Sequence, residues 1–137
     1  MKTLQAIAAC ITLACLGFAW PAAAAGKFDG SKPMLCAVTA IHECTAAEGK
    51  CERDNPQAGN NLPTFIRVDL GAKTLSAEDG RKTEIKISGI VDGQLMLQGV
   101  ENGRAWSMVI GSETGRWGGS VVEDDGSFAL FGACTLP

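Results

Sequence analysis

The fold of this chain is decided by residues 81–134, which read RKTEIKISGIVDGQLMLQGVENGRAWSMVIGSETGRWGGSVVEDDGSFALFGAC. Short apolar and polar alternations are separated by Gly-containing turns, of which Asp92-Gly93 and Asn102-Gly103 are the clearest. Asp-Gly and Asn-Gly favour type I′ turns, because both central residues must take positive φ and these residue types do so at low cost. Turns repeated about every 9–12 residues predict an antiparallel meander.

The same alternation extends toward the N-terminus, and we expect about eight strands in all. Residues 66, 68 and 70 are Ile, Val and Leu, so residues 64–70 have one apolar face. The first predicted strand is apolar on both faces, which is typical of a buried position. The eight predicted strands lie at 34–42, 64–70, 73–77, 82–91, 94–100, 104–110, 115–122 and 127–134.

An antiparallel meander of eight strands has two exposed edges, and a closed sheet has none. The sequence therefore favours an all-β fold, a small closed up-and-down barrel, with a two-sheet β-sandwich as the alternative. An eight-stranded barrel is just wide enough to be filled by side chains or to hold one small ligand. The residues expected to fill it are Ile85, Ile87, Leu95, Leu97, Trp106, Met108, Ile110, Phe128 and Leu130.

Residues 1–25 have the pattern of a secretory signal peptide. A short basic start is followed by an almost wholly apolar run and by Ala22-Ala23-Ala24-Ala25, which offers an A-x-A cleavage site before Gly26. A membrane anchor is the alternative, but the apolar run is shorter than the roughly 20 residues that a spanning helix needs. We expect residues 26–137 to form a single small β domain.

The charge of this domain argues against several partners. Residues 26–137 lack Lys2 and keep 11 of the 12 basic residues against 15 acidic ones. The basic residues are scattered and form no stripe that would neutralise phosphates, so nucleic acid is not an expected partner. The pattern also contains no basic amphipathic helix, and no stable membrane insertion is expected after signal cleavage.

Four cysteines lie in the exported part, and an even number in such a domain predicts two disulfides. Cys44 and Cys51 bracket a short loop, whereas Cys36 and Cys134 lie in the first and last predicted strands. We favour the pairs Cys36–Cys134 and Cys44–Cys51, because the first would tie the two ends of the sheet together. A metal site built from Cys36, His42, Cys44 and Cys51 is the rival interpretation, although it lacks close C-x-x-C pairs.

Residues 43–63 form the least regular part of the domain and are expected to be a disulfide-stapled loop. Thr45-Ala46-Ala47-Glu48 fits a capping box, which predicts one helical turn inside that loop. Loops braced on a rigid sheet often carry recognition, so this segment is one candidate site.

Trp106 and Trp117 form the other candidate site. Indole rings can stack on a ligand, and Arg104 or Arg116 beside them could pair with an anion. The structural alternative is that both Trp side chains fill the core and both Arg side chains are solvated.

No catalytic constellation is visible, and we do not expect an enzyme, a cofactor or a metal centre. His42-Glu43-Cys44 suggests a nucleophile beside a base, but a disulfide-bonded cysteine is not a nucleophile. The acidic run 123–126 lacks the alternation of a calcium loop. The Gly-rich run 115–120 lacks a phosphate-loop Lys and is more typical of a strongly bent strand.

Several short stretches resemble a group of small secreted proteobacterial proteins of unassigned function. They are Phe28-Asp29-Gly30, Leu35-Cys36-Ala37, Gly49-Lys50-Cys51-Glu52-Arg53, Val68-Asp69, residues 97–104 and Phe131-Gly132-Ala133-Cys134-Thr135. The resemblance implies a periplasmic or secreted protein of a Gram-negative bacterium. In strand number the chain also looks like calycin-type small β-barrels, which include lipocalin-like carriers and periplasmic protease inhibitors, although the lipocalin G-x-W opening is missing.

These observations lead to two expectations about function. The first is an exported binding module for a small ligand or for an envelope or secreted protein partner. The alternative is a proteinaceous inhibitor of an exported hydrolase, acting through residues 43–63 or through the N-terminal arm 26–33.

Overall fold

The structure is a computed structural model that describes residues 26–54 and 62–137. The predicted signal peptide, residues 1–25, lies outside the described residues. The described part is all-β and contains no helix, and its strands are β1 (Met34–Thr45), β2 (Lys50–Asp54), β3 (Phe65–Asp69), β4 (Thr74–Ala77), β5 (Lys82–Glu84), β6 (Ile87–Val91), β7 (Gln94–Glu101), β8 (Arg104–Gly111), β9 (Arg116–Val122) and β10 (Gly126–Thr135).

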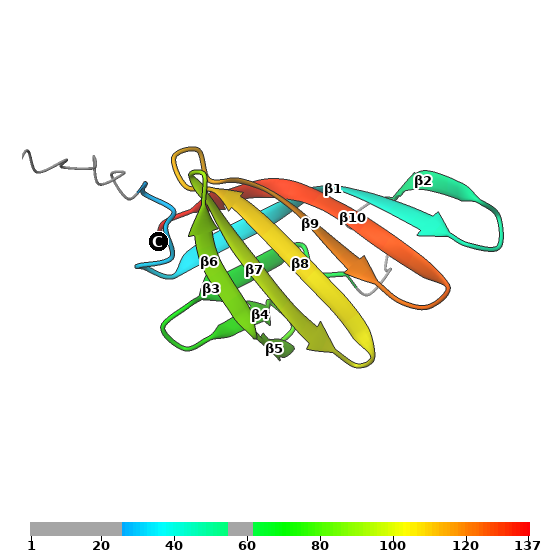
Figure 1. Ribbon diagram of the computed structural model, residues 1–137, viewed down its shortest axis with the longest axis horizontal. Helices are drawn as coiled ribbons and strands as arrows, with labels where there is room; N and C mark the ends of the chain where they lie inside the picture. The colour runs from blue at the N-terminus through cyan, green and yellow to red at the C-terminus, as the bar shows by residue number, and fades with distance from the viewer. Residues whose placement is uncertain (1–25, 55–61) are drawn as a thin grey trace, which may run out of the picture.

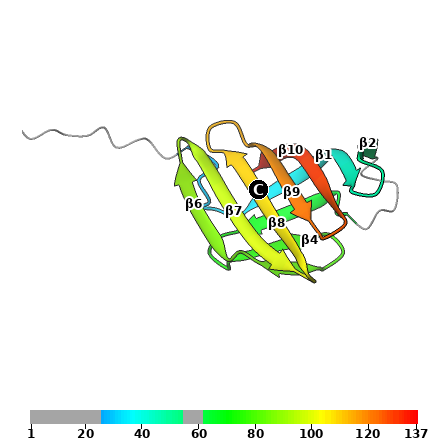
Figure 2. The same ribbon diagram turned by 45° about the vertical axis from the view of Figure 1, so that its right-hand side comes forward.

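Nine of these strands form one antiparallel sheet that is strongly curled (Figures 1 and 2). The order across the sheet is β5-β4-β3-β1-β10-β9-β8-β7-β6, and β2 pairs with β1 beside this path. The meander predicted for residues 81–134 is therefore present, and β10 returns to lie beside β1 as Figure 1 shows. Right-handed strand twist makes a long run of paired strands curl around its own apolar face.

Strand β1 is the organising strand because it is long enough to serve several partners. One of its edges pairs with β10, while the other pairs with β3 through residues 34–37 and with β2 through residues 41–45. The pairing with β10 shifts register between Val38 and Ala40, where Thr39 is inserted and its Oγ1 donates to Phe131 O. Such a bulge bends the strand and increases its local twist.

The number of strands differs from the eight expected, for two reasons. Residues 50–54 form β2, whose five residues KCERD carry mostly charged side chains and hide any apolar alternation. The predicted strand 82–91 is divided at Ile85 and Lys86 into β5 and β6. Ile85 N donates to Lys73 O beside β4, whereas Lys86 N donates to Gln98 O on β7, so two successive residues bond to opposite ends of the sheet.

This division also explains an error in the predicted core. Ile85 is buried as expected, but Ile87 is 62% exposed and lies on the outer face opposite Gln98. Regular alternation would put both residues on one face, and the irregular step at Lys86 changes the face on which the following residues lie. The other expected core residues are buried or half-buried inside the curl.

The hairpin turns follow the sequence prediction at two positions. Asp92 and Gly93 have φ values of 49° and 75°, and Asn102 and Gly103 have values of 49° and 79°, as type I′ turns require. The turn before β10 is different, because Glu123 N donates to Gly126 O and the central residues are two aspartates without positive φ. Asp125-Gly126 is therefore not the centre of a type I′ turn.

The four described cysteines form two disulfides, Cys36–Cys134 and Cys44–Cys51, which are the pairs that the sequence favoured. Both bridges join residues that lie directly opposite each other on neighbouring strands. The first bridge is buried in the core and links strands 98 residues apart in the sequence. Because these sulfurs are bonded to each other, they are not thiolate ligands, and the rival metal site is excluded in this form of the protein.

Within residues 43–63, the stapled segment is a hairpin rather than an irregular loop. Residues 43–45 complete β1, a turn occupies residues 46–49, and β2 returns along β1. The one helical turn predicted here corresponds to the turn at residues 46–49, in which Gly49 N donates to Thr45 O. Residues 55–61 lie outside the described residues. Over the ranges that are described, no helix has the length and apolar character needed to span a membrane.

Candidate functional site

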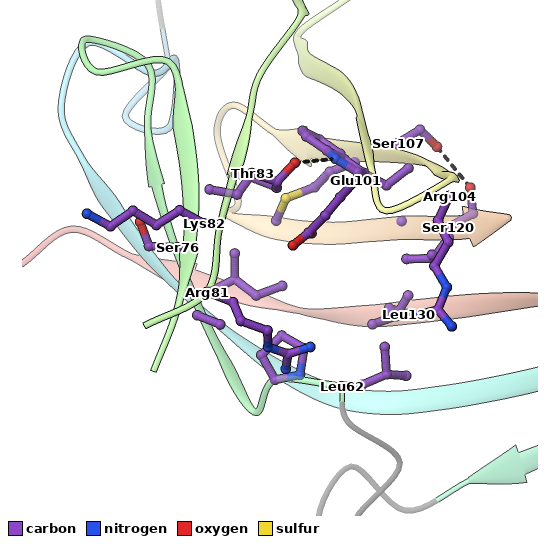
Figure 3. Close-up of a pocket in the computed structure, with 18 of the residues that line it drawn as sticks. Leu62, Ser76, Arg81, Lys82, Thr83, Glu101, Arg104, Ser107, Ser120 and Leu130 are labelled. Carbon is purple, nitrogen blue, oxygen red and sulfur yellow. Dashed lines mark hydrogen bonds between the residues drawn. The ribbon is translucent and has the colours of Figure 1, made fainter. Parts of the chain in front are cut away.

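The interior of the curled sheet is filled at one end and hollow at the other. At the β8–β9 turn, Phe28 N donates to Ser112 O and the Phe28 ring packs under Gly115, where an added Cβ would come within 2.7 Å of Cζ. At the opposite end, beside the β4–β5 and β7–β8 turns, a cavity of about 170 Å³ opens to solvent (Figure 3).

Apolar side chains from both halves of the sheet line this cavity. The meander contributes side chains from β8, β9 and β10, and the shorter strands β3 and β4 contribute the facing wall. The apolar lining consists of Leu62, Pro63, Ile66, Leu75, Ala77, Trp106, Met108, Trp117, Val121 and Leu130. An apolar cavity of this size is comparable with the engineered protein cavity of about 150 Å³ that binds benzene.

Both tryptophans predicted as ligand contacts line the cavity, and both are also part of the core. Trp106 is 9% exposed and Trp117 is 5% exposed. Trp106 lies opposite Val121 on β9, and Trp117 lies four residues before Val121 on that strand. At about 3.3 Å per residue, the backbone positions from which the two indoles extend lie about 13 Å apart along the strand, so the rings enter the interior at different depths.

The indole N–H groups are already occupied. Trp106 Nε1 donates to Thr83 Oγ1 at 3.1 Å, and Trp117 Nε1 donates to Ala37 O at 3.1 Å (the first is drawn in Figure 3). A buried indole needs such a partner, because an unpaired N–H in the interior is costly. The two rings therefore offer the cavity an apolar surface and no free donor.

Charged side chains surround the mouth of the cavity. Arg81 lies just before β5, and Glu101 and Arg104 flank the β7–β8 turn, whereas the Lys82 side chain points away from the cavity (Figure 3). Arg104 Nε donates to Glu123 Oε2 at 2.8 Å, and Arg81 Nε donates to Asp79 Oδ2 at 2.6 Å. Ion pairs this exposed contribute little stability, so the guanidinium groups can exchange these partners for a bound anion.

Carboxylates beside the mouth are held in their ionised form. Burial raises the pKa of Glu78, but its Oε1 and Oε2 accept hydrogen bonds from Thr64 N at 2.8 Å and Phe65 N at 2.9 Å, and the net effect is a pKa below its ordinary value. The hydrogen bond from Arg81 N lowers the pKa of Asp79 in the same way. Glu78 thereby anchors the start of β3 to the β4–β5 turn at the rim.

The two arginines predicted as anion partners are placed differently. Arg104 lines the cavity, whereas Arg116 is exposed at the start of β9 next to the inward-facing Trp117. Neighbouring residues of a strand point to opposite faces, so Arg116 lies on the outer face of the sheet. The structure brings Trp106, Trp117 and Arg104 to one cavity and leaves Arg116 outside it.

Sequence reasoning missed the half of the cavity that is formed by β3, β4 and β5. Ser76, Lys82 and Thr83 lie on short strands, and Arg81 lies just before one; the polar composition of these strands carries no signal for an interior position. The pairing of Leu75 with Thr83 would have suggested that these residues share a face, but only the sheet order shows what they face.

The remaining candidates stay apart from the cavity. The His42 ring packs edge-on against Phe131, with ring centroids 6.3 Å apart, and Cys44 beyond Glu43 is bonded to Cys51. Across residues 26–54 and 62–137, no three His, Cys, Asp or Glu side chains are grouped so that they could hold a metal ion.

Comparison of the chain with protein-family models, with curated proteins and with solved structures found no match. The description of the fold and of the cavity therefore rests on the geometry of the described residues.

Proposed function

We propose that this protein is an exported binding module whose cavity holds a small ligand with an apolar ring and an anionic group. The observation that carries the proposal is the cavity of about 170 Å³ with tryptophan walls and cationic side chains at its mouth. The proposal is one of binding, with no chemical step.

The size and lining of the cavity define the ligand class. Typical sites for drug-sized ligands measure about 300–1,000 Å³, so this cavity suits one aromatic ring or a short branched acyl group. Because both indole N–H groups are engaged, the body of the ligand would be held by apolar and aromatic contacts. Sulfur–aromatic contact with Met108 would suit the same ring.

The rim supplies the preference for an anion. Two arginines, Arg81 and Arg104, line the opening together with one carboxylate, Glu101, and the ion-pair partners of the arginines, Asp79 and Glu123, lie beside it. An arginine binds a carboxylate through two parallel hydrogen bonds, which fixes orientation as well as adding affinity. A ligand whose ring enters first would leave its carboxylate at this rim.

The proposal includes a location outside the cytoplasm. Two disulfides are typical of oxidising compartments outside the cytoplasm. With the signal peptide expected in residues 1–25, we place the protein in the periplasm or the extracellular medium.

We also infer that residues 82–86 bridge β4 and β7 and close the curled sheet into a barrel at the cavity end, while β6 beyond them keeps one open edge. The support is the partner change at residues 85 and 86, where one backbone N–H bonds to Lys73 and the next bonds to Gln98. Thr83 adds a contact across the same junction, because its Oγ1 donates to Val100 O at 3.4 Å. Closure would give the cavity a continuous wall.

Benzoate, phenylacetate and uncharged toluene test the ligand class, with tryptophan fluorescence of the exported protein as the readout. We expect saturable changes with the two carboxylates and weaker binding of toluene. Arg104→Ala should weaken benzoate binding about tenfold, as loss of one charge-assisted hydrogen bond does. Arg116→Ala is the matched control, because that arginine lies on the same strand as Trp117 but outside the cavity.

A second variant separates the cavity from the surface. Val121→Phe places a ring in the cavity and should abolish the response to both carboxylates while circular dichroism shows an unchanged fold. Saturable binding that survives Val121→Phe, or equal loss with Arg104→Ala and Arg116→Ala, would contradict the proposal.

The alternative, an inhibitor of an exported hydrolase, is favoured by one observation. The hairpin formed by the end of β1 and by β2 projects beyond the rest of the sheet, is braced by Cys44–Cys51, and has exposed side chains from Lys50 to Arg53 (Figure 1). Pull-down from periplasmic and culture extracts, with and without Cys44 and Cys51 replaced by Ser, tests this function. Identical partner profiles would argue against it.

A further inference from the structure

Strand β6 is an open sheet edge of a kind that proteins normally protect. All five of its residues are exposed, and the sequence Ile87-Ser88-Gly89-Ile90-Val91 contains no charge and no proline. The sheet order ends at β6, so within the described residues its second edge carries no strand partner. Unpaired backbone groups on such an edge are a template for pairing with another chain.

The other exposed strands are protected by the usual devices. Strand β5, at the opposite end of the sheet order, has three residues, of which Lys82 and Glu84 are charged. Strand β2 has charged residues at four of its five positions. Short length and charged side chains discourage edge pairing, whereas β6 is longer than β5 and, unlike β2, carries no charge.

The hairpin that β6 forms with β7 determines which backbone groups are free. A two-residue turn at Asp92-Gly93 makes Val91 and Gln94 a hydrogen-bonded pair. Hydrogen-bonded pairs alternate along an antiparallel ladder, so Gly89 and Ile87 also direct their N–H and C=O groups toward β7. The N–H and C=O groups of Ser88 and Ile90 therefore point away from β7, to the open edge.

We propose that β6 pairs with β6 of a second copy of this chain, antiparallel, about a two-fold axis at Gly89. In this register Ser88 of each copy exchanges two backbone hydrogen bonds with Ile90 of the other, giving four bonds in total. The two Gly89 residues face each other in the close, non-hydrogen-bonded pair, where the absence of side chains removes any clash at the axis.

Side-chain complementarity selects this register over its neighbours. Ile87 of one copy lies opposite Val91 of the other, and these side chains are 62% and 54% exposed in the single chain. One position further out, Lys86 lies opposite Asp92 of the other copy. An axis at Ser88 would pair Lys86 with Ile90, and an axis at Ile90 would pair Asp92 with Ser88, so only the axis at Gly89 joins opposite charges.

The charge contact is available to a second chain. Lys86 contacts the Glu84 carboxylate, but the side chains of both are more than half exposed, and such a pair is weakly held. Asp92 is exposed at the tip of the turn. Cross-strand pairs of opposite charge stabilise a ladder, and like charges destabilise it.

Cross-linking tests the axis directly. In the proposed register the Cα atoms of the two Gly89 residues lie about 4.5 Å apart, within the range that a disulfide bridges. An added Cβ at Gly89 meets no atom within 4 Å, so Gly89→Cys is compatible with the single chain. We expect Gly89→Cys to form a disulfide-linked dimer on mild oxidation, with Cys36–Cys134 and Cys44–Cys51 intact by peptide mapping.

Ile87→Cys is the matched control for the cross-link. Under the proposed axis the two residues at position 87 are separated by four positions, about 13 Å, which is too far for a disulfide. A dimer cross-linked as efficiently by Ile87→Cys as by Gly89→Cys would overturn the register.

Sedimentation equilibrium and native mass spectrometry of the uncross-linked protein test the dimer itself. Ile90→Pro removes an edge-facing N–H without removing a bond to β7, and it should raise the dimer dissociation constant at least about tenfold. Ile90→Thr keeps that N–H and should leave the dimer in place. Circular dichroism checks that both variants fold.

A protein that stays monomeric at every concentration measured, or a dimer unaffected by Ile90→Pro, would overturn the proposal. So would recovery of the native protein as a monomer bound through β6 to an extended segment of a different protein. Ligand binding in the cavity does not enter these measurements, so their outcome is independent of the proposed function.

Discussion

Single residues at the β1–β10 junction show how closely the backbones approach inside the curl. Gly132 lies opposite both Val38 and Trp117, and the Trp117 ring covers it. The position requires glycine because of this contact rather than because of its φ angle. Trp117 Nε1 reaches Ala37 O only because no side chain stands between them.

Gly132→Ala is therefore expected to destabilise the protein. Its Cβ would lie 1.8 Å from Ala37 O and 2.5 Å from Trp117 Nε1, so the backbone pairing of β1 with β10 would have to open. We expect a loss of at least about 2 kcal/mol in the free energy of unfolding, measured by urea denaturation with disulfides intact. Gly118→Ala is the control, because its Cβ would meet Phe131 at an ordinary 3.5 Å. An equal loss in both variants would refute the packing argument.

Among the elements, the link between β5 and β6 decides whether the sheet behaves as an open curl or as a barrel. The two strands are separated by two residues, of which Ile85 bonds to Lys73 just before β4 and Lys86 bonds to β7, toward opposite ends of the sheet order. An open edge frays, whereas a bent strand held on both sides does not.

Hydrogen exchange of the Ile85 and Lys86 amides distinguishes the two behaviours. If residues 82–86 close the sheet at the cavity end, both amides should exchange as slowly as the central amides of β7, because one is bonded beside β4 and the other to β7. The Gly103 amide, at the tip of a type I′ turn, supplies the fast-exchanging reference. Fast exchange of Lys86 together with slow exchange of β7 would mean that the sheet opens at this junction.

For the whole molecule, the Cys36–Cys134 bridge fastens the first strand of the sheet to the last strand of the chain. It joins residues 98 apart, whereas Cys44–Cys51 joins residues 7 apart in a projecting hairpin. A small domain has limited apolar area to bury, and a cross-link that restricts the unfolded chain compensates for this.

Removal of the two bridges should therefore have unequal effects. Loop-closure entropy predicts a loss of about 4.7 kcal/mol for the Cys36→Ala/Cys134→Ala variant and about 2.4 kcal/mol for the Cys44→Ala/Cys51→Ala variant. Urea denaturation of the two double variants measures this difference. Equal losses, or a larger loss for the hairpin bridge, would contradict the role assigned to Cys36–Cys134.

The sequence by itself determined the local features of this protein. Alternation defined most strands, and the positive-φ turns at Asp92-Gly93 and Asn102-Gly103 defined two hairpins, because both depend on residues close together in the chain. The favoured cysteine pairs followed from the short loop between Cys44 and Cys51 and from the positions of Cys36 and Cys134 in the first and last predicted strands. Trp106 and Arg104 were recognised as candidates because large aromatics and cations are informative in any sequence.

Only the tertiary structure decided which strands and side chains face one another. It showed that the step at Lys86 turns Ile87 outward, that Arg116 lies outside the cavity that Arg104 lines, and that Arg81 completes its rim. It also left β6 as the uncharged edge. These relations depend on strand order and register across long sequence separations, which many weak contacts set together and which no local pattern encodes.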